Sequence, residues 1–442
     1  MTSTSPILHN ARIAWFSHNA QPPSDNMVIA LADAGMQIVD WARKRPDTFC
    51  DIALLDVRGA ETPVHSAIDL SELAKRLFIP GGLIVTASQS IETHERAALR
   101  KIGDVCFTTA SHEPLIGVLR ERLRLASLAE ETGERLKTLV SMGCYFRFPP
   151  INPEDKRPSV LLAGVASPLT LSASNAVREW AGETACVFSA GQVMRALDHT
   201  TFDAAIFIPE DENDLLLALA RALRRHRQHR RSPVLLTSKE EGLVERLTAR
   251  DGFDCVLPDH LDSDLAPRIH LSVRRASMAA TMRQFLHSAD GAAGKPLTAV
   301  NAKFFAQHAV RLYQRANDTN RPLTLIGLSI ESSSSSLARN ELTGAVGRAI
   351  KTVARIIRAE DMVARLTPTM LVVLASTTEK NSTKIAERLD GVVSGTLSRA
   401  IIEQSRITTQ YVVRTQNESV EESLARLIGL IKNPAEETGT VS

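Results

Sequence analysis

Short apolar segments alternate with amphipathic segments along the first two thirds of the chain. In the first third, four apolar runs lie at residues 12–16, 52–56, 82–88 and 104–109. Helical patterns stand between them, such as SAIDLSELAKRLF at 66–78. The second third repeats this order, with apolar runs at 159–164, 203–208, 233–238 and 254–258. Apolar strands that alternate with helices predict two doubly wound α/β domains, each with a parallel sheet covered on both faces.

The last third of the chain has a different order of elements. A helix is expected first, at 299–316, followed by a strand at 324–331 and a second helix at 341–357. Two strands at 362–366 and 371–376 are then joined by a short turn, which predicts a hairpin. The remaining expected elements are a helix, a strand and a helix at 381–393, 407–413 and 420–431. This order is typical of an α+β domain.

Two stretches rich in residues that end helices and strands divide the chain. They read FRFPPINPEDKRPS at 146–159 and SADGAAGKP at 288–296, and both are interpreted as linkers. The predicted domains are therefore 10–145, 157–288 and 289–436, with a tail at 437–442. The first two end in long helical patterns, at 114–142 and 262–287, which either pack on their own sheets or pair with a second subunit.

Composition and charge exclude several classes of protein. The 442 residues carry 52 Lys and Arg against 50 Asp and Glu, a near-balance that disfavours a protein built to coat nucleic acid. Five scattered cysteines without a CxxC pair favour free thiols in a reducing cytoplasm over disulfides or a zinc site. The start of the chain lacks a signal-peptide pattern, and no apolar run approaches the length of a membrane span. A cytoplasmic protein without membrane insertion is therefore expected.

One segment is strongly basic, RALRRHRQHRR at 221–231. His226 and His229 could share a helix face, but the neighbouring arginines would repel a cation and no third ligand is visible. No aromatic residue is interleaved for base stacking. We therefore expect neither a metal site nor nucleic-acid binding here, and favour a solvated helix or a docking patch for an acidic partner.

The order of elements and two local features carry a family resemblance. Asp56 ends the apolar run at 52–56, and Arg358-Ala359-Glu360-Asp361 stands between the expected helix at 341–357 and the expected hairpin. The first two domains resemble response-regulator receiver domains, and the third resembles the GGDEF diguanylate cyclase domain. The receiver–receiver–GGDEF order is that of the PleD-type regulators, and the decay described below is similar to the PopA type. The resemblance covers nearly the whole chain. It implies two flavodoxin-like receiver folds followed by a nucleotidyl-cyclase-like α+β fold.

Both receiver-like domains depart from the residues that phosphorylation requires. The first keeps the acceptor, Asp56, and the threonine, Thr86, whereas the acidic Mg²⁺ pair and the lysine are replaced by Ser17, His18 and Thr109. Because Mg²⁺ neutralises the incoming phosphoryl group beside a carboxylate, Asp56 is expected to be a poor phosphoacceptor. The second domain has Ile208 at the acceptor position and is expected to be structural.

The GGDEF-like domain has lost its hallmark turn, which reads Thr367-Pro368-Thr369-Met370-Leu371. The two metal-binding carboxylates of the family align with Ser329 and Thr369. Two-metal chemistry needs carboxylates to hold the ions, so we expect no metal site and no cyclase activity.

The family's inhibitory site for cyclic di-GMP, Arg-x-x-Asp, is retained as Arg358 and Asp361. Arg can donate to guanine N7 and O6 or face a phosphate, and Asp can accept from the guanine N1–H and N2–H groups. The motif alone is weak, since a helix-end Arg beside a turn Asp is common. Its place between helix and hairpin favours the ligand site. Arg388 and Arg315 are expected to help grip the ligand, although each could instead belong to a solvated helix face.

The resemblance implies a non-catalytic cyclic di-GMP effector that needs no other cofactor. It further implies a signalling adaptor in cell-cycle control, which is homodimeric through its receiver domains. Such an adaptor localises to a cell pole and recruits partners, including protease adaptors, for regulated proteolysis. The alternative is an active diguanylate cyclase regulated by phosphorylation. An output protein that binds DNA is disfavoured because no helix-turn-helix or winged-helix segment is recognisable.

Overall fold

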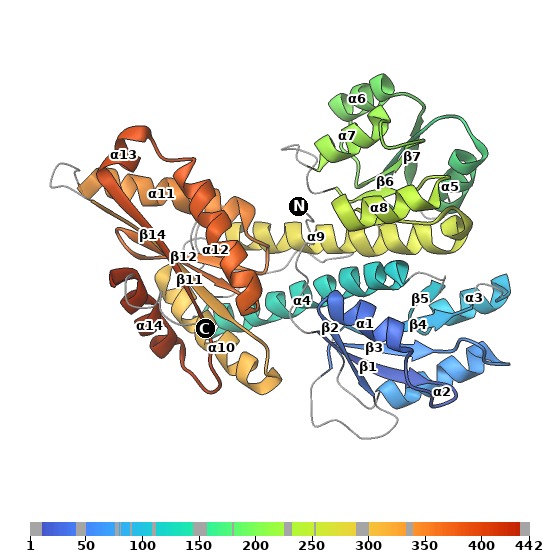
Figure 1. Ribbon diagram of the computed structural model, residues 1–442, viewed down its shortest axis with the longest axis horizontal. Helices are drawn as coiled ribbons and strands as arrows, with labels where there is room; N and C mark the ends of the chain where they lie inside the picture. The colour runs from blue at the N-terminus through green and yellow to red at the C-terminus, as the bar shows by residue number, and fades with distance from the viewer. Residues whose placement is uncertain are drawn as a thin grey trace. The chain divides into compact units, whose positions relative to one another are not determined.

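Three sheets and their covering helices make up the part of the chain that the computed structural model describes (Figure 1). These residues are 11–40, 50–75, 79, 81–88, 91–107, 112–144, 157–178, 181–224, 232–251, 253–288, 300–332 and 339–433. Both predicted linkers lie almost wholly outside them, and the predicted domain limits stay a prediction. The fold class is as predicted, because two doubly wound parallel sheets precede an α+β domain with an antiparallel sheet.

The first sheet has five parallel strands in the order β2-β1-β3-β4-β5, the flavodoxin-like arrangement. Its strands are β1 (Ala11–Ser17), β2 (Met36–Asp40), β3 (Ile52–Asp56), β4 (Leu83–Ala87) and β5 (Asp104–Phe107). Its helices are α1 (Asp25–Asp33), α2 (Pro63–Lys75), α3 (Thr93–Arg100) and α4 (Glu113–Ser141). Every residue of β3 is buried, which explains its uninterrupted apolar run. Asp56 ends this strand, at the edge where such sheets form their sites.

The second sheet repeats this arrangement, with the order β10-β9-β8-β6-β7. Its strands are β6 (Ser159–Gly164), β7 (Glu183–Val187), β8 (Ala204–Ile208), β9 (Val234–Leu236) and β10 (Asp254–Cys255). Its helices are α5 (Pro168–Arg178), α6 (Ala190–His199), α7 (Leu215–Leu223), α8 (Glu241–Asp251) and α9 (Ala266–Ser288). The internal repeat that the sequence predicts is therefore a repeat of one fold.

Two strands, β2 and β7, were not predicted. Each lies at an edge of its sheet, where a strand has only one neighbour. Their sequences, MQIVD and ETACV, include polar residues, and no position of β7 is fully buried. Because an edge strand needs less apolar surface than a central one, the signal of a buried strand is missing from both.

The third sheet is antiparallel, with the order β12-β13-β11-β14. Its strands are β11 (Thr324–Ser332), β12 (Met362–Thr367), β13 (Met370–Ala375) and β14 (Ser405–Val413). Its helices are α10 (Ala302–Thr319), α11 (Arg339–Ile356), α12 (Glu379–Ser394), α13 (Arg399–Gln404) and α14 (Val420–Lys432). Alternate side chains divide between two cores, so that Leu325 packs with α10 and α14 and Ile326 packs with α11 and α12. Figure 1 shows these helices around the third sheet. The short α13 was not predicted.

The chain divides into two compact units. One comprises residues 1–127 and 149–278, and the other comprises residues 128–148 and 279–442. The end of α4, from Leu128 onward, therefore belongs to the same unit as the third sheet. Leu139 is fully buried in the core formed with α10 and α14, and Leu136 packs against that core. Among the described helices, none is long and apolar enough to cross a membrane.

Candidate functional site

The loop between α11 and β12, residues 357–361, carries Arg358 and Asp361. We call it the α11–β12 loop. Helix α11 ends at Ile356 and β12 begins at Met362, so the whole motif lies in the loop. The backbone N–H of Arg358 donates to Oδ2 of Asp361 at 3.0 Å. This hydrogen bond closes a tight turn, and both side chains therefore start from one short stretch of backbone.

Asp361 is a partly exposed residue, and burial of its carboxyl group is the main cause that raises its pKa to about 7. The neighbouring Glu360 and the more distant Glu131 act in the same direction, whereas Arg358 lowers the pKa by its charge and its N–H. The carboxyl group can therefore change protonation near neutral pH. A ligand that offers N–H donors would favour its ionised form.

Helix α4 contributes an arginine to this loop that no sequence motif indicated. Nη2 of Arg135 donates to the backbone oxygens of Glu360 at 3.1 Å and of Asp361 at 3.3 Å. The Arg135 side chain is fully buried, and its Nε donates to Glu131 at 2.6 Å. It lies 226 positions before Asp361 in the sequence, so only the fold brings the two together.

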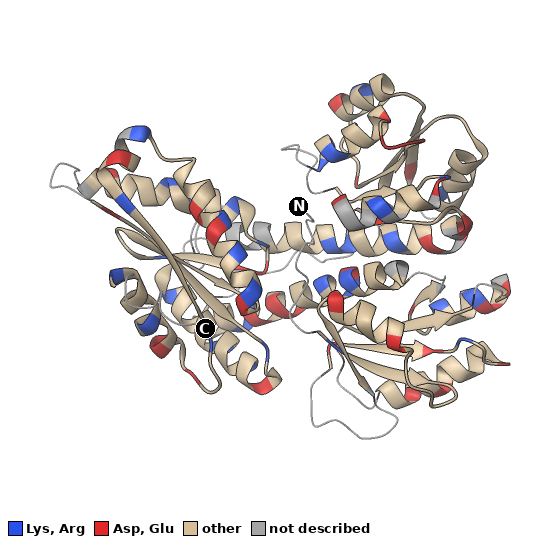
Figure 2. Cartoon of the chain, in the orientation of Figure 1, with Lys and Arg blue, Asp and Glu red and all other residues tan. Residues whose placement is uncertain are grey.

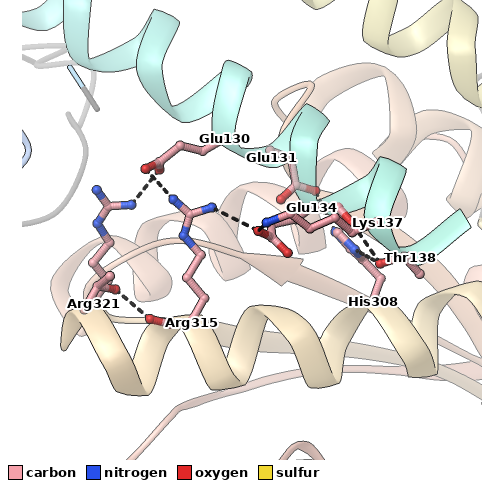
Figure 3. A network of polar contacts seen from close by, with 9 residues as sticks. Glu130, Glu131, Glu134, Lys137, Thr138, His308, Arg315 and Arg321 are labelled. Carbon is pink, nitrogen blue, oxygen red and sulfur yellow. Dashed lines mark hydrogen bonds and ion pairs between the residues drawn. The ribbon is translucent and has the colours of Figure 1, made fainter. Parts of the chain in front are cut away.

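The two other predicted ligand residues occupy different surroundings. Arg315 of α10 forms ion pairs with Glu130 and, at 3.9 Å, with Glu134, both on α4 (Figure 3). Arg388 is exposed on α12, a helix along which basic and acidic residues are mixed (Figure 2). Arg315 is therefore already paired with acidic groups, whereas the side chain of Arg388 is accessible to a ligand.

Ser329 and Thr369, the residues expected at the metal-carboxylate positions of the family that the chain resembles, lie near each other in the third sheet. Ser329 of β11 lies opposite Met370 in the strand register, and Thr369 directly precedes Met370. Ser329 is buried, and its hydroxyl donates to Glu331 at 3.1 Å. Thr369 uses its backbone oxygen to accept from the N–H of Ile330 at 2.9 Å. Among the described residues, no group of three His, Cys, Asp or Glu side chains is placed to hold a metal.

Asp56 in the first sheet is held by an arginine that sequence reasoning missed. Nε and Nη2 of Arg58 donate to the two carboxylate oxygens at 2.7 and 2.9 Å, and the backbone N–H of Arg58 donates at 3.2 Å. Thr86 also donates its hydroxyl to this carboxylate at 3.0 Å. The ion pair raises the pKa of Arg58. A guanidinium cation thus contacts both oxygens of the Asp56 carboxylate. Thr109, the predicted replacement of the lysine, lies outside the described residues.

The corresponding pocket of the second sheet is apolar at its centre. Ile208 is almost fully buried at the acceptor position, and the hydroxyl of Thr237 has no hydrogen-bond partner among the described residues. In the basic segment, Arg221 pairs with Asp251 at 2.6 Å and Arg224 lies over the ring of Phe253 at 4.6 Å. These two arginines pack on their own domain. The rest of the segment, with both histidines, lies outside the described residues.

Comparisons with known proteins give structural similarities only. No protein-family model matches the chain, and no curated protein matches it. A diguanylate cyclase (DGC) protein from Thermotoga maritima is 18% identical, covers 31% of this chain and 99% of its own, and has a TM-score of 0.27. The GGDEF domain of DgcB from Caulobacter crescentus, solved with c-di-GMP, is 17% identical, covers 32% of this chain and 86% of its own, and has a TM-score of 0.26.

A receiver-containing structure is also similar. The C-terminal part of RcsC from E. coli, with its linker region and phosphoreceiver domain, is 14% identical and has a TM-score of 0.20. It covers 64% of this chain and 97% of its own. Because all three TM-scores are below 0.5, the fold is assigned from the strand orders described above.

Proposed function

We propose that this chain is a non-catalytic effector that binds cyclic di-GMP at the α11–β12 loop. The observation that carries the proposal is the hydrogen bond from the Arg358 N–H to the Asp361 carboxylate at 3.0 Å. It holds the Asp361 carboxylate against the backbone of Arg358, on the loop where the GGDEF-type resemblance implies an inhibitory site. In this proposal the chain is similar to the PopA type of receiver–receiver–GGDEF regulator.

The chemistry of the two side chains fits guanine. The guanidinium of Arg358 can donate to N7 and O6 of the base, a contact that discriminates against the wrong base by about 1–3 kcal/mol. The carboxylate of Asp361 can accept from N1–H and from the exocyclic N2–H of the same base. The two phosphates of the ligand would face the exposed Arg388. Arg315 would reach a ligand only by leaving its partners on α4, so it is the weaker of the two candidates.

Loss of catalysis is the second part of the proposal. The positions that would supply metal carboxylates carry Ser329 and Thr369, whose neutral hydroxyl groups are poor ligands for Mg²⁺. Glu331 is close to Ser329 but is a single carboxylate, which does not replace two. The alternative of a phosphorylation-regulated active cyclase would need two metal ions at this place. It would also need a modified Asp56, although Arg58 already covers that carboxylate.

The cellular role is proposed from the family resemblance. It comprises a homodimer formed through the receiver-like domains and an adaptor role in cell-cycle control at a cell pole. Protein partners there would include protease adaptors. The internal ion pair of Asp56 and the buried Ile208 support receiver-like domains that act as interaction surfaces rather than as phosphorylation switches.

Calorimetric titration of the full chain with cyclic di-GMP tests the binding proposal. Saturable binding is expected, and titration with cyclic di-AMP under the same conditions serves as the control ligand. Adenine has neither the N1–H donor nor the O6 acceptor, so cyclic di-AMP should bind at least ~10-fold more weakly. Equal affinity for both ligands, or no heat with cyclic di-GMP, would rule out guanine recognition at this loop.

A further inference from the structure

The end of α4 is built into the domain that carries the α11–β12 loop. Residues 128–148 share one compact unit with residues 279–442. Leu139 is fully buried in the core between the third sheet and α10, and Leu136 and Met142 pack against that core. This segment is far from the loop in sequence, yet it belongs to the same folded body.

A buried polar network lies between α4 and α10. Glu131 accepts from Nε of Arg135 at 2.6 Å and lies 2.9 Å from Nε2 of His308, whose Nδ1 lies 2.9 Å from the hydroxyl of Thr138. The side chains of Arg135, His308 and Thr138 have no exposed surface. Figure 3 shows Glu131 and Thr138 of α4 facing His308 of α10. Such a network fixes α4 in one register, because Glu131, Thr138 and His308 each contact a polar partner at a defined place.

Arg135 connects this network to the α11–β12 loop. Its Nε donates a hydrogen bond to Glu131, whereas its Nη2 donates to the backbone oxygens of Glu360 and Asp361 at 3.1 and 3.3 Å. A buried ion pair is often no more stable than well-packed apolar residues, so packing alone does not require a guanidinium here. What an apolar side chain could not provide is donation to the two carbonyl groups. These belong to the residue that bears the guanine-binding carboxylate and to its neighbour.

We propose that Arg135 is a positioning residue for ligand recognition. It holds the backbone at Glu360 and Asp361 in the conformation from which the Asp361 carboxylate meets the ligand. The proposal deepens the proposed function and rests on cyclic di-GMP binding at this loop. By thermodynamic reciprocity, a ligand that fixes the loop also strengthens the docking of α4 on its own unit.

The test compares two substitutions in the same network. Arg135→Met removes the donors to the loop, and Thr138→Val removes a hydrogen bond to His308 without touching the loop. In titrations of the full chain, Arg135→Met should weaken cyclic di-GMP binding roughly 2- to 30-fold, and Thr138→Val should leave it unchanged within about twofold. If Arg135→Met binds as tightly as the parent, or if both variants weaken binding equally, Arg135 has no positioning role.

A double-mutant cycle separates positioning from general destabilisation. In a background of Asp361→Asn, the loss caused by Arg135→Met should shrink, because Arg135 acts through Asp361. Additive losses would contradict the proposal. Arg135→Lys keeps a cation beside Glu131 but has one nitrogen instead of a fork. It should therefore be folded and still bind more weakly than the parent.

Hydrogen exchange tests the effect of Arg135 on the α11–β12 loop without any ligand. The amide of Arg358 donates to Asp361, so its exchange rate in the ligand-free chain reports the order of the loop. Arg135→Met should speed this exchange more than Thr138→Val does. A parent that fails to bind cyclic di-GMP refutes the proposed function. The exchange rates then decide the positioning role alone, and equal rates in both variants would refute it.

Discussion

Glu131→Gln is a direct test of whether the buried network of α4 stabilises the compact unit formed by residues 128–148 and 279–442, which we call the C-terminal unit. Burial by itself would raise the pKa of Glu131, but Arg135 and then His308 outweigh it and hold the pKa at about 2. The ordinary pKa of a glutamate side chain is 4.5, so the folded protein strongly favours the ionised form of Glu131 over the protonated form. The substitution removes this charge and leaves the guanidinium of Arg135 buried without its counter-ion.

The magnitude follows from the shift in pKa. At about 1.4 kcal/mol per pKa unit, the lowered pKa of Glu131 contributes about 3 kcal/mol to the free energy of unfolding at pH 7. This matches the lower end of the ~3–5 kcal/mol that breaking a buried pair costs. Because the folded pKa is the lower one, the contribution is complete above the unfolded value and is lost as the pH falls towards 2. Glu131→Gln should therefore lower the free energy of unfolding by about 3 kcal/mol at neutral pH and by clearly less at pH 3.

The matched control is Glu403→Gln. Glu403 pairs with Arg399 at 2.8 Å with the same four-residue spacing, but both of these side chains are exposed. Loss of this ion pair should lower the free energy of unfolding by no more than ~0.5 kcal/mol. No tryptophan occurs in residues 128–148 or 279–442 of the sequence, so fluorescence would not report on this unit. Urea-dependent hydrogen exchange of α10 peptides is therefore the suitable assay. Equal costs for the two substitutions, or a cost at Glu131 that does not change with pH, would refute the reasoning.

GTP and Mg²⁺ should yield no cyclic di-GMP, because Ser329 and Thr369 supply no metal carboxylate. Synthesis of cyclic di-GMP from added GTP, by an activity that stays with the protein through successive columns, would contradict this. Acetyl phosphate should label Asp56 slowly or not at all, because Arg58 already pairs with both carboxylate oxygens. Strong labelling that disappears in Asp56→Asn would show that this pairing is no barrier. Affinity for cyclic di-GMP should fall between pH 8 and pH 6, because protonation of Asp361, whose pKa is raised to about 7, removes the acceptor. Titrations at both pH values should show weaker cyclic di-GMP binding at pH 6 in the parent and equal affinities at the two pH values in Asp361→Asn.

The sequence predicts the fold well where burial is complete on both faces. The central strand β3, IALLD, is a continuous apolar run because helices cover both sides of its sheet. The edge strands β2 and β7 were not predicted, because their partly exposed positions tolerate polar residues and so leave no continuous apolar run. Strand prediction from apolar runs therefore succeeds at the centre of both parallel sheets and at the edge strands β5 and β10, and it fails at the edge strands β2 and β7.

The candidate site is predictable only as far as its residues are neighbours in the sequence. Arg358 and Asp361 are three positions apart, so their motif fixes both their spacing and their shared loop. Arg58 follows Asp56 by two positions, and its basic charge was visible, but the pattern does not show that its side chain turns back onto the carboxylate. Arg135 had no local signal, because its link to the loop depends on how α4 packs in the C-terminal unit.

The central claim, that Arg358 recognises the ligand, is tested most directly by the affinity of Arg358→Ala for cyclic di-GMP. Arg355→Ala is the matched control, because Arg355 is an exposed arginine in the last turn of the preceding helix. Loss of a bidentate contact to guanine should weaken binding roughly 5- to 150-fold in Arg358→Ala. Arg355→Ala should bind within about twofold of the parent, which is the spread that a change of one exposed charge produces. If Arg358→Ala binds as tightly as the parent, the Arg-x-x-Asp motif is not the ligand site and the account is wrong.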